Sequence, residues 1–395
     1  MAEAIVAGHL CLDILPAFVS DQGNDLALYL APGRLTEVGP TTLSTGGPVS
    51  NAGLNLHRLG IHTQLMAKVG DDLWGQAILD IVRSQGLGLA EGMIVVPDEA
   101  SSYSLVIDPP GVDRAFLHCP GTNHTFGADD VRYDLLADAR LFHFGYPPLM
   151  TRMYADGGQE LGEMFRRAKE TGVTTSLDLV MPDPSGPSGQ ADWPLILTRA
   201  LPYVDLFVPS VEELLFMLRR EQFDALTSQV GAANLLEALT IEEILSLGNK
   251  VLTMGAKILL LKLGTRGLYL RSGDQLCDLG RGAPPYLPAW TGRQLWVPCF
   301  QPDRVVSTVG TGDAAIAGFL AALLRASGPE LALNVSVAAG ACCVEEPGAL
   351  GGVRTWEKTL ARMEAGWARL HLDLETHSWR WHGDVTVWRG PDDSG

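Results

Sequence analysis

The sequence lacks several patterns that would point to a particular compartment or binding site. It has no C-x-x-C pair, so neither zinc-ligand pairs nor a secreted disulfide framework is indicated. No run of about 18 or more apolar residues appears, so no membrane-spanning helix is expected. No basic segment followed by an apolar one opens the chain, so we expect no signal peptide and a reduced, cytoplasmic protein. The six cysteines are Cys11, Cys119, Cys277, Cys299, Cys342 and Cys343.

The sequence also has few basic residues and lacks two common nucleotide-binding motifs. The 29 lysines and arginines face 46 aspartates and glutamates, which gives a formal net charge of −17. Because nucleic acid and anionic membranes repel an acidic surface, neither is expected as a partner. The Walker-type loop G-x-x-x-x-G-K-[ST] is absent. No G-x-G-x-x-G follows the first predicted strand, which disfavours a dinucleotide-dependent oxidoreductase.

What the chain does contain is ample hydrophobic sequence that alternates between strand and helix patterns. Its 395 residues are 46% hydrophobic, enough for one large core. Buried strands are predicted over 4–10, 63–69, 139–144, 173–177, 205–208 and 257–262. Helices are predicted over 73–85, 153–171, 193–200, 211–220, 313–326 and 330–345. We therefore predict a single domain over residues 1–395, a three-layer α/β/α sandwich with a mostly parallel central sheet.

Three stretches interrupt this alternation. Strand-like segments cluster over about 92–123 without helices between them, and about 16–43 contains extended pieces such as 26–30. Together they predict a small antiparallel β-sheet beside the main fold. Residues 280–302 are rich in proline, glycine and tryptophan and are typical of an insertion at the mouth of a site. Trp290 and Trp296 would there either line the site or simply pack within the loop.

The stretch 307–313, S-T-V-G-T-G-D, carries the clearest chemical pattern. Three β-forming residues, 304–306, lead into a turn with two glycines, and an apolar helix begins at Asp313. Gly310 and Gly312 allow the amides of the turn to point at one anion, and the helix N-terminus adds partial positive charge. A carboxylate at this place either caps the helix or accepts a proton from a hydroxyl that attacks a phosphate.

Earlier in the chain, a few polar and glycine positions suit the binding of a polyol. Asp13 follows the first buried strand, where ligands collect in open α/β sheets, although it could instead cap a neighbouring backbone. Gly46 and Gly47 precede a helix and allow a ligand close to the backbone, and Asn51 offers both a donor and an acceptor. The other interpretation of these glycines is a plain helix entry.

These pieces, in this order, resemble the signatures of the ribokinase-like carbohydrate kinases, also called the PfkB family. The stretch 307–313 is similar to D-T-x-G-A-G-D, and 46–60 is similar to G-G-x-x-x-N-x-A-x-x-L-x-x-L-G. Residues 69–75 resemble the family's V-G-x-D-x-x-G, and 262–267 resemble its turn on the nucleotide side. The resemblance covers about residues 5–352, which is most of the chain.

The resemblance implies ATP-dependent phosphorylation of a hydroxyl of a sugar or sugar-like molecule, assisted by Mg²⁺. The small sheet would then be a lid that closes over the sugar and excludes water, and its exposed edge allows a homodimer. The implied catalytic residues are Asp313 as general base and Gly310, Thr311 and Gly312 as an anion hole. The implied binding residues are Asp13, Gly46, Gly47 and Asn51 for the sugar, Lys262, Gly264, Gly267 and Thr308 for the nucleotide, and Glu213 for magnesium through water.

Two of the departures from the family pattern bear on cation binding. Ser307 replaces an aspartate that helps to bind a monovalent cation in some relatives, which puts such a cation in doubt. Ser210 replaces the asparagine of N-x-x-E, whereas Glu213 matches its glutamate. These replacements motivate a second interpretation, a non-catalytic sugar- or nucleotide-binding protein on the same fold. The acceptor is left open among ribose, fructose, a keto-deoxy acid, a nucleoside and a sugar phosphate; for an acidic acceptor, Arg114 is either a contact or a solvated surface residue.

Overall fold

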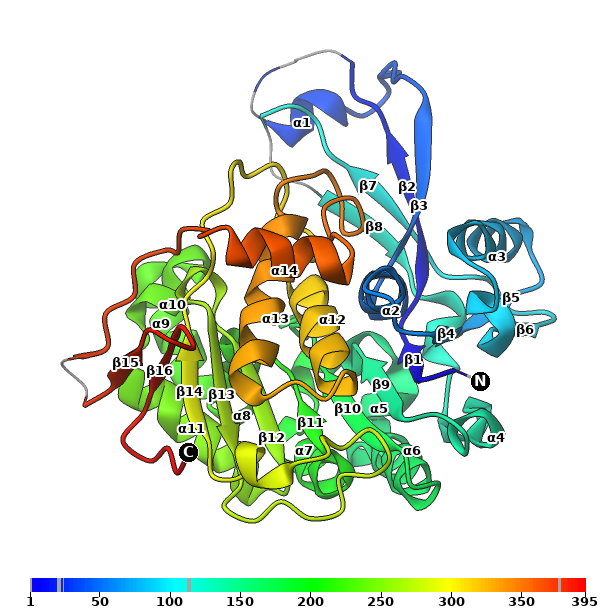
Figure 1. The fold of residues 1–395 in the computed structure, drawn as a ribbon. Coiled ribbons are helices and arrows are strands. Elements are labelled where there is room, and N and C mark those ends of the chain that lie inside the picture. The colour runs from blue at the N-terminus through cyan, green and yellow to red at the C-terminus, as the bar shows by residue number, and fades with distance from the viewer. Residues whose placement is uncertain (1, 20–22, 24, 112–114, 376–377) are drawn as a thin grey trace.

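The computed structural model (Figure 1) describes residues 2–19, 23, 25–111, 115–375 and 378–395. Its main sheet has the strand order β15-β16-β14-β13-β12-β11-β10-β9-β1-β4. Neighbouring strands are parallel from β4 to β12 and antiparallel from β12 to β15. The strands are β1 (Ala4–Gly8), β4 (Thr63–Met66), β9 (Leu141–Gly145), β10 (Thr174–Asp178), β11 (Leu206–Phe207), β12 (Ile258–Lys262), β13 (Leu268–Ser272), β14 (Gln294–Val297), β15 (Arg380–His382) and β16 (Val387–Arg389).

Helices cover both faces of this sheet because each buried strand sends alternate side chains to opposite sides. In β12, Ile258 and Leu260 enter one core, and Leu259 and Leu261 enter the other. On the face of Ile258 pack α2 (Pro48–Arg58), α3 (Leu73–Gln85), α12 (Thr311–Leu324), α13 (Pro329–Cys343) and α14 (Trp356–Glu364). On the other face pack α6 (Gln159–Glu170), α7 (Trp193–Ala200), α8 (Val211–Leu218) and α11 (Ile241–Thr253). The predicted three-layer architecture is thus confirmed.

A second sheet, which we call the small sheet, has the strand order β3-β2-β7-β8 and rises above the α/β body in Figure 1. Its strands are β2 (Cys11–Pro16), β3 (Thr41–Gly46), β7 (Tyr103–Ile107) and β8 (Ala115–Cys119). Only His9 and Leu10 separate β1 from β2, so the small sheet continues directly from the main sheet. This short link places side chains of both sheets close to one another.

The small sheet differs in three details from the sequence prediction. Strands β2 and β7 run parallel, so the sheet is mixed rather than antiparallel. The predicted extended piece at 26–30 forms helix α1 (Leu26–Tyr29), because the Asp25 side chain accepts from Ala27 N–H at 2.9 Å and caps it. Strand β6 (Ile94–Val96) pairs with β5 (Lys68–Gly70) in a separate two-stranded sheet.

Three predictions outside the small sheet also need correction. Residues 280–302, predicted as an insertion, contribute β14 to the main sheet. Trp290 and Trp296 are 1% and 0% exposed, which agrees with the packed alternative for these two residues and not with a site wall. No strand forms over 304–306, where Val306 N–H instead donates to the Val344 carbonyl at 2.7 Å. The predicted helix 153–171 is divided into α5 (Thr151–Tyr154) and α6, because Asp156, at φ 50°, leaves the helical region of φ and ψ.

Two further observations concern the cysteines and the helices. All six cysteines are free thiols. None of the helices in the described part of the chain combines the length and the hydrophobicity that crossing a membrane requires.

Candidate active site

The carboxylate of Asp313 lies in the first turn of α12, directly after the glycine turn. Gly310 has φ 72°, and a Cβ there would lie 2.2 Å from the Ala349 Cβ, so a glycine is required at this turn. Although Asp313 is only 2% exposed, its carboxylate is well supplied with donors. Asn51 Nδ2 donates to Oδ2 at 3.0 Å, and the Tyr146 hydroxyl lies 3.2 Å from Oδ1 and 3.0 Å from Oδ2.

This environment sets the protonation of both Asp313 and Tyr146. Burial raises the pKa of Asp313, and the hydrogen bonds from Asn51 and Tyr146 offset only part of that rise. Burial also raises the pKa of Tyr146 well above its ordinary value, and the nearby Asp313 charge raises it further. The Tyr146 hydroxyl therefore keeps its proton and donates it, while Asp313 is a stronger base than an exposed aspartate.

The backbone of the glycine turn supplies donors beside this carboxylate. Thr311 N–H points back to the Thr308 carbonyl at 3.3 Å, and the Thr311 hydroxyl donates to the same oxygen at 2.9 Å. Of the three amides predicted to form an anion hole, that of Thr311 is therefore already engaged. The first amides of an α-helix have no acceptor within the helix, which leaves Gly312 among those able to bind an anion.

Beside the turn lies a cluster of buried charges. Lys262 Nζ donates to Asp178 Oδ1 at 2.7 Å, and a Cβ on Gly312 would lie 3.7 Å from the same Nζ. Glu213 is 8% exposed and accepts from Ser210 N–H at 2.7 Å in a capping box at the start of α8. Burial disfavours charge on Lys262, but Asp178 and Glu213 outweigh it and raise the Lys262 pKa.

Asp178 is a second carboxyl of this cluster with a raised pKa. It is fully buried at the end of β10, and its Oδ2 atom finds no hydrogen-bond partner among the described residues. Burial raises its pKa to about 8 against the opposing effect of Lys262, and the charges of Glu213 and Asp313 raise it further. Three carboxyl groups thus surround one ammonium group, a charge balance that suits an additional cation.

The residues predicted to bind a sugar meet near the base of the small sheet. Asp13 lies within β2, not at the end of β1 as predicted, and a Cβ on Gly46 would come within 2.3 Å of its Oδ2. A Cβ on Gly47 would come within 2.7 Å of His9 Nδ1. The His9 and Tyr146 ring centres are 6.4 Å apart, and Tyr146 contacts Asp313. These contacts link the small sheet to the carboxylate of α12.

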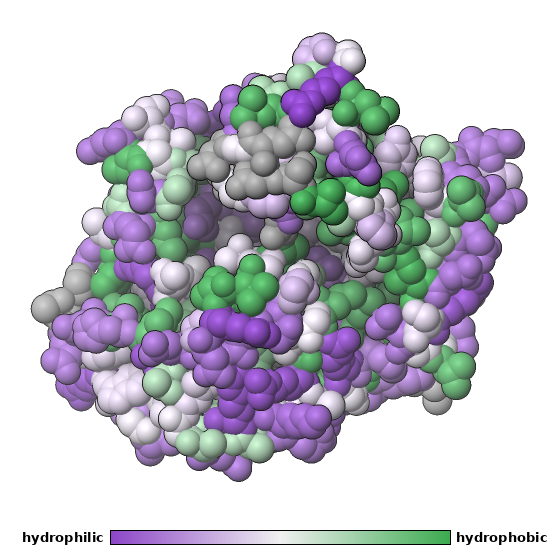
Figure 2. All heavy atoms as spheres, turned by 90° about the horizontal axis from the view of Figure 1, so that it is seen from above, coloured by the Kyte–Doolittle hydropathy of each residue, from purple (hydrophilic) through white to green (hydrophobic). Residues whose placement is uncertain are grey.

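The other predicted nucleotide residues lie around two turns. Gly264 and Gly267 lie at the two ends of the turn after β12. Lys262, the last residue of β12, donates to Asp178 and so belongs to the buried charge cluster. Thr308 is exposed and closes the turn that precedes α12. Arg114 lies outside the described residues. The face of the molecule seen from above is hollowed, as Figure 2 shows.

Sequence reasoning missed Tyr146, Asp178, His9 and His118. Asp178 ends a predicted strand, which is the pattern that drew attention to Asp13, and Tyr146 directly follows β9. The two histidines carry no recognisable motif, because His118 comes from β8 and meets His9 only through the fold.

Comparison with known proteins identifies the family. Residues 15–356 match the family model described as pfkB family carbohydrate kinase. The chain belongs to this family. Membership confirms the predicted resemblance and the prediction of a carbohydrate kinase.

Two sugar-kinase relatives and one solved structure are distant from this chain but align with most of it. An uncharacterized sugar kinase from Archaeoglobus fulgidus is 25% identical over 300 residues, 76% of this chain and 98% of the relative. A 2-dehydro-3-deoxygluconokinase from Bacillus subtilis is 25% identical over 350 residues, 87% of this chain and 94% of the relative. An Arabidopsis thaliana ribokinase solved with ribose and ATP has a TM-score of 0.67 at 18% identity, over 91% of this chain and 98% of that one. The ribokinase-like fold, with its smaller second sheet, is thereby confirmed.

Proposed function

We propose that the protein transfers the terminal phosphoryl group of ATP to a hydroxyl of a sugar or sugar-like acceptor, with Asp313 as the general base. The observation that carries the proposal is the buried Asp313 carboxylate, oriented by Asn51 and Tyr146 at the glycine turn of α12. Membership of the pfkB family and the ATP-bound ribokinase of similar fold support ATP as the donor. The reaction requires a base beside the turn that binds the phosphate, because the acceptor hydroxyl must lose its proton at that place.

In the proposed reaction, Asp313 takes the proton of the acceptor hydroxyl. The acceptor oxygen forms a bond to the terminal phosphorus as the bond between that phosphorus and the ADP oxygen breaks. The amides of Gly310 and Gly312, aided by the Lys262 ammonium beside Gly312, stabilise the negative charge on the phosphoryl oxygens. Thr311 contributes less than predicted, because its amide already bonds to Thr308.

A hydroxyl-rich acceptor fits the polar atoms left unpaired between α2 and the small sheet. Asn51 Oδ1 and His9 Nδ1 are buried, and neither has a hydrogen-bond partner among the described residues. A buried polar atom without a partner is costly, so these atoms are suited to bind hydroxyls. We infer that Asn51, His9 and Asp13 orient the acceptor, while Gly46 and Gly47 make room for it.

Magnesium is proposed to bind beside Asp178, Glu213 and Lys262. The unpaired Oδ2 of Asp178 and the excess of carboxyl groups fit a divalent cation with oxygen ligands. Glu213 Oε2 is occupied by Ser210 N–H, so a magnesium-bound water would use its other oxygen. When bound with ATP, magnesium supplies neutralisation of the phosphate charge. Ser307, in place of the family's aspartate, gives no reason to propose a monovalent cation.

We further propose that residues 1–395 form one domain and that the small sheet is a lid over the acceptor. The 16–43 and 92–123 segments supply its connections and strands β7 and β8, while 280–302 supplies β14 of the main sheet. Exposed hydrophobic side chains on β8, Phe116 and Leu117, support a homodimer through this sheet.

The decisive experiment measures ADP release by wild-type protein with Mg²⁺-ATP across sugars, sugar acids and nucleosides, followed by identification of the phosphorylated product. Replacement of Asp313 by Asn is expected to lower kcat by about 10²- to 10⁴-fold, the usual contribution of a general base. Asp224→Asn is the matched control, because Asp224 is an exposed aspartate paired with Arg220 on the surface. Near-wild-type turnover in Asp313→Asn would contradict the proposal. Thermal stabilisation by acceptors without any ADP release would favour a non-catalytic binding protein instead.

A further inference from the structure

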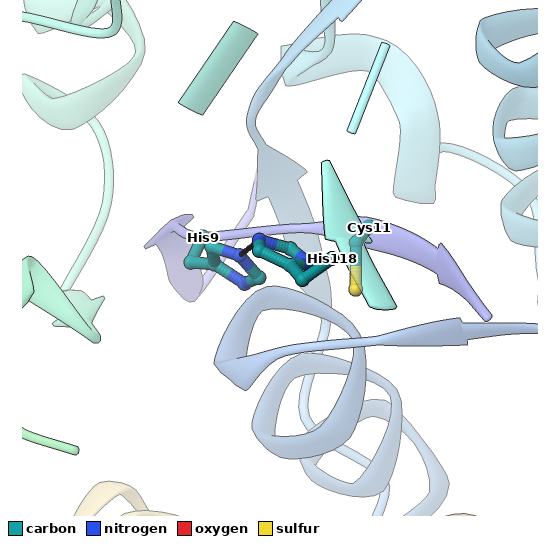
Figure 3. Close-up of side chains that lie close together, drawn as sticks. All are labelled: His9, Cys11 and His118. Carbon is teal, nitrogen blue, oxygen red and sulfur yellow. Dashed lines mark hydrogen bonds between the residues drawn. The ribbon is translucent and has the colours of Figure 1, made fainter. Parts of the chain in front are cut away.

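Three side chains able to bind a metal meet at the base of the small sheet (Figure 3). His9 lies in the link between β1 and β2, Cys11 begins β2, and His118 lies on β8. Their ligand atoms all lie within 4.8 Å of one another. Since His9 and His118 lie 109 positions apart in the sequence, only the tertiary structure brings the three together.

The distance between the Nε2 atoms of the two histidines matches that expected for two ligands of one metal ion. The atoms are 3.4 Å apart, which is long for an N–H···N hydrogen bond. Two nitrogens bound tetrahedrally to one zinc ion, each at about 2.1 Å, would be about 3.4 Å apart. The same arrangement would place the ring centres about 5.2 Å apart. The observed distance between the ring centres is 5.3 Å.

The surroundings of the three residues support a built site. His9 and Cys11 are buried, at 3% and 4% exposure. Ser104 Oγ lies 2.9 Å from His118 Nδ1 and 3.7 Å from Cys11 Sγ, so one hydroxyl orients two of the three side chains. The Cys11 thiol donates to Asp13 Oδ1 at 3.4 Å, so the thiolate formed on metal binding would lie beside a second negative charge that only the bound cation offsets. A hydrogen bond to the ring nitrogen that does not bind the metal, such as that between Ser104 and His118 Nδ1, is typical of metal-binding histidines.

We propose that His9, Cys11 and His118 bind one divalent cation of the zinc class. Imidazole and thiolate ligands suit Zn²⁺ and Co²⁺, whereas Mg²⁺ requires oxygen ligands. Binding would release the proton of the Cys11 thiol to solvent and convert the thiol to a thiolate ligand. Three protein ligands leave a fourth position for water or for a hydroxyl.

The proposed ion would connect the small sheet to the α/β body, since His118 belongs to β8 and His9 follows β1. It would also fix the His9 tautomer, because a metal on Nε2 leaves the ring proton on Nδ1, the atom beside Gly47. The site is separate from the magnesium position proposed beside Glu213, and the proposal does not depend on phosphoryl transfer.

The test uses full-length protein without an affinity tag, stripped of metal with a chelator and titrated with Co²⁺. Wild type is expected to bind one equivalent with a thiolate-to-cobalt charge-transfer absorption, and Zn²⁺ but not excess Mg²⁺ should abolish it. Cys11→Ser should lose this absorption, and His118→Ala should weaken binding by more than about 100-fold. Ser104→Ala, which removes only an outer partner, should weaken binding by about 10- to 100-fold. Cys277→Ser and His382→Ala are matched controls remote in sequence from the site and should bind as wild type does.

Three results would overturn the proposal: no stoichiometric Co²⁺ binding, charge transfer retained in Cys11→Ser, or unchanged affinity in His118→Ala. Circular dichroism establishes that each variant is folded. Should the buried Cys11→Ser variant not fold, His118→Ala decides alone, because His118 is exposed. Zn²⁺ should raise the Tm of wild type but not that of His118→Ala. Failure here would leave the ADP-release experiment unaffected.

Discussion

Replacing Tyr146 by Phe tests how the active-site base is tuned. The Tyr146 hydroxyl lies 3.2 and 3.0 Å from the two oxygens of Asp313 and favours the charged carboxylate. Tyr146→Phe removes this donor while the ring remains. The pKa of Asp313, already raised by burial, should therefore rise further. Because a general base acts in its deprotonated form, the acid limb of the kcat/KM profile should move to higher pH.

The size of this movement follows from the hydrogen bond that is lost. A hydrogen bond to a charged group contributes about 1.5–3 kcal/mol. One pH unit corresponds to about 1.4 kcal/mol, so the acid limb should move upward by about one to two units. The effect on kcat/KM should be large below the limb and small on the plateau, where Asp313 is deprotonated in both proteins.

The assay is steady-state ADP release with subsaturating acceptor, measured across pH in wild type and variant. The kcat/KM profile is the appropriate one, because it reports the free enzyme. Tyr133→Phe serves as a control: the Tyr133 hydroxyl donates to the Ala128 carbonyl, and the residue does not contact Asp313. An acid limb that stays in place or moves to lower pH in Tyr146→Phe would refute the proposed coupling.

Three further predictions address the charge cluster, the acceptor pocket and the small sheet. Lys262→Met leaves buried Asp178 without its ion-pair partner and should lower the free energy of unfolding by about 3–5 kcal/mol in urea denaturation at a pH above the Asp178 pKa of about 8, with partial recovery in Lys262→Met/Asp178→Asn. Gly46→Ala adds a methyl group that would meet the Asp13 carboxylate. The acceptor KM should rise by about 10- to 100-fold while the ATP KM stays unchanged, and an unchanged acceptor KM would argue against this acceptor pocket. Phe116→Glu should convert a dimer to a monomer in sedimentation, and a monomeric wild type would exclude the dimer.

The sequence predicted best those features that depend on local interactions. Helices α3 and α7 have the predicted bounds, and each begins where Asp72 or Asp192 caps it through a hydrogen bond within the first turn. The turn before Asp313 was recognisable for the same reason, since a glycine turn followed by an apolar helix is a contiguous pattern. The small sheet was predicted as a sheet, but its strand directions and its exact members depend on pairing between distant segments.

The amino-acid sequence by itself therefore determined the alternation of strands and helices, the family signatures and the acidic residue at the start of α12. Only the tertiary structure placed Tyr146 against that residue, Asp178 against Lys262, and His118 against His9. The physical reason is that a hydrogen bond or ion pair between two side chains depends on their separation in space. For these pairs, that separation is set by strands and helices packed together from distant parts of the chain.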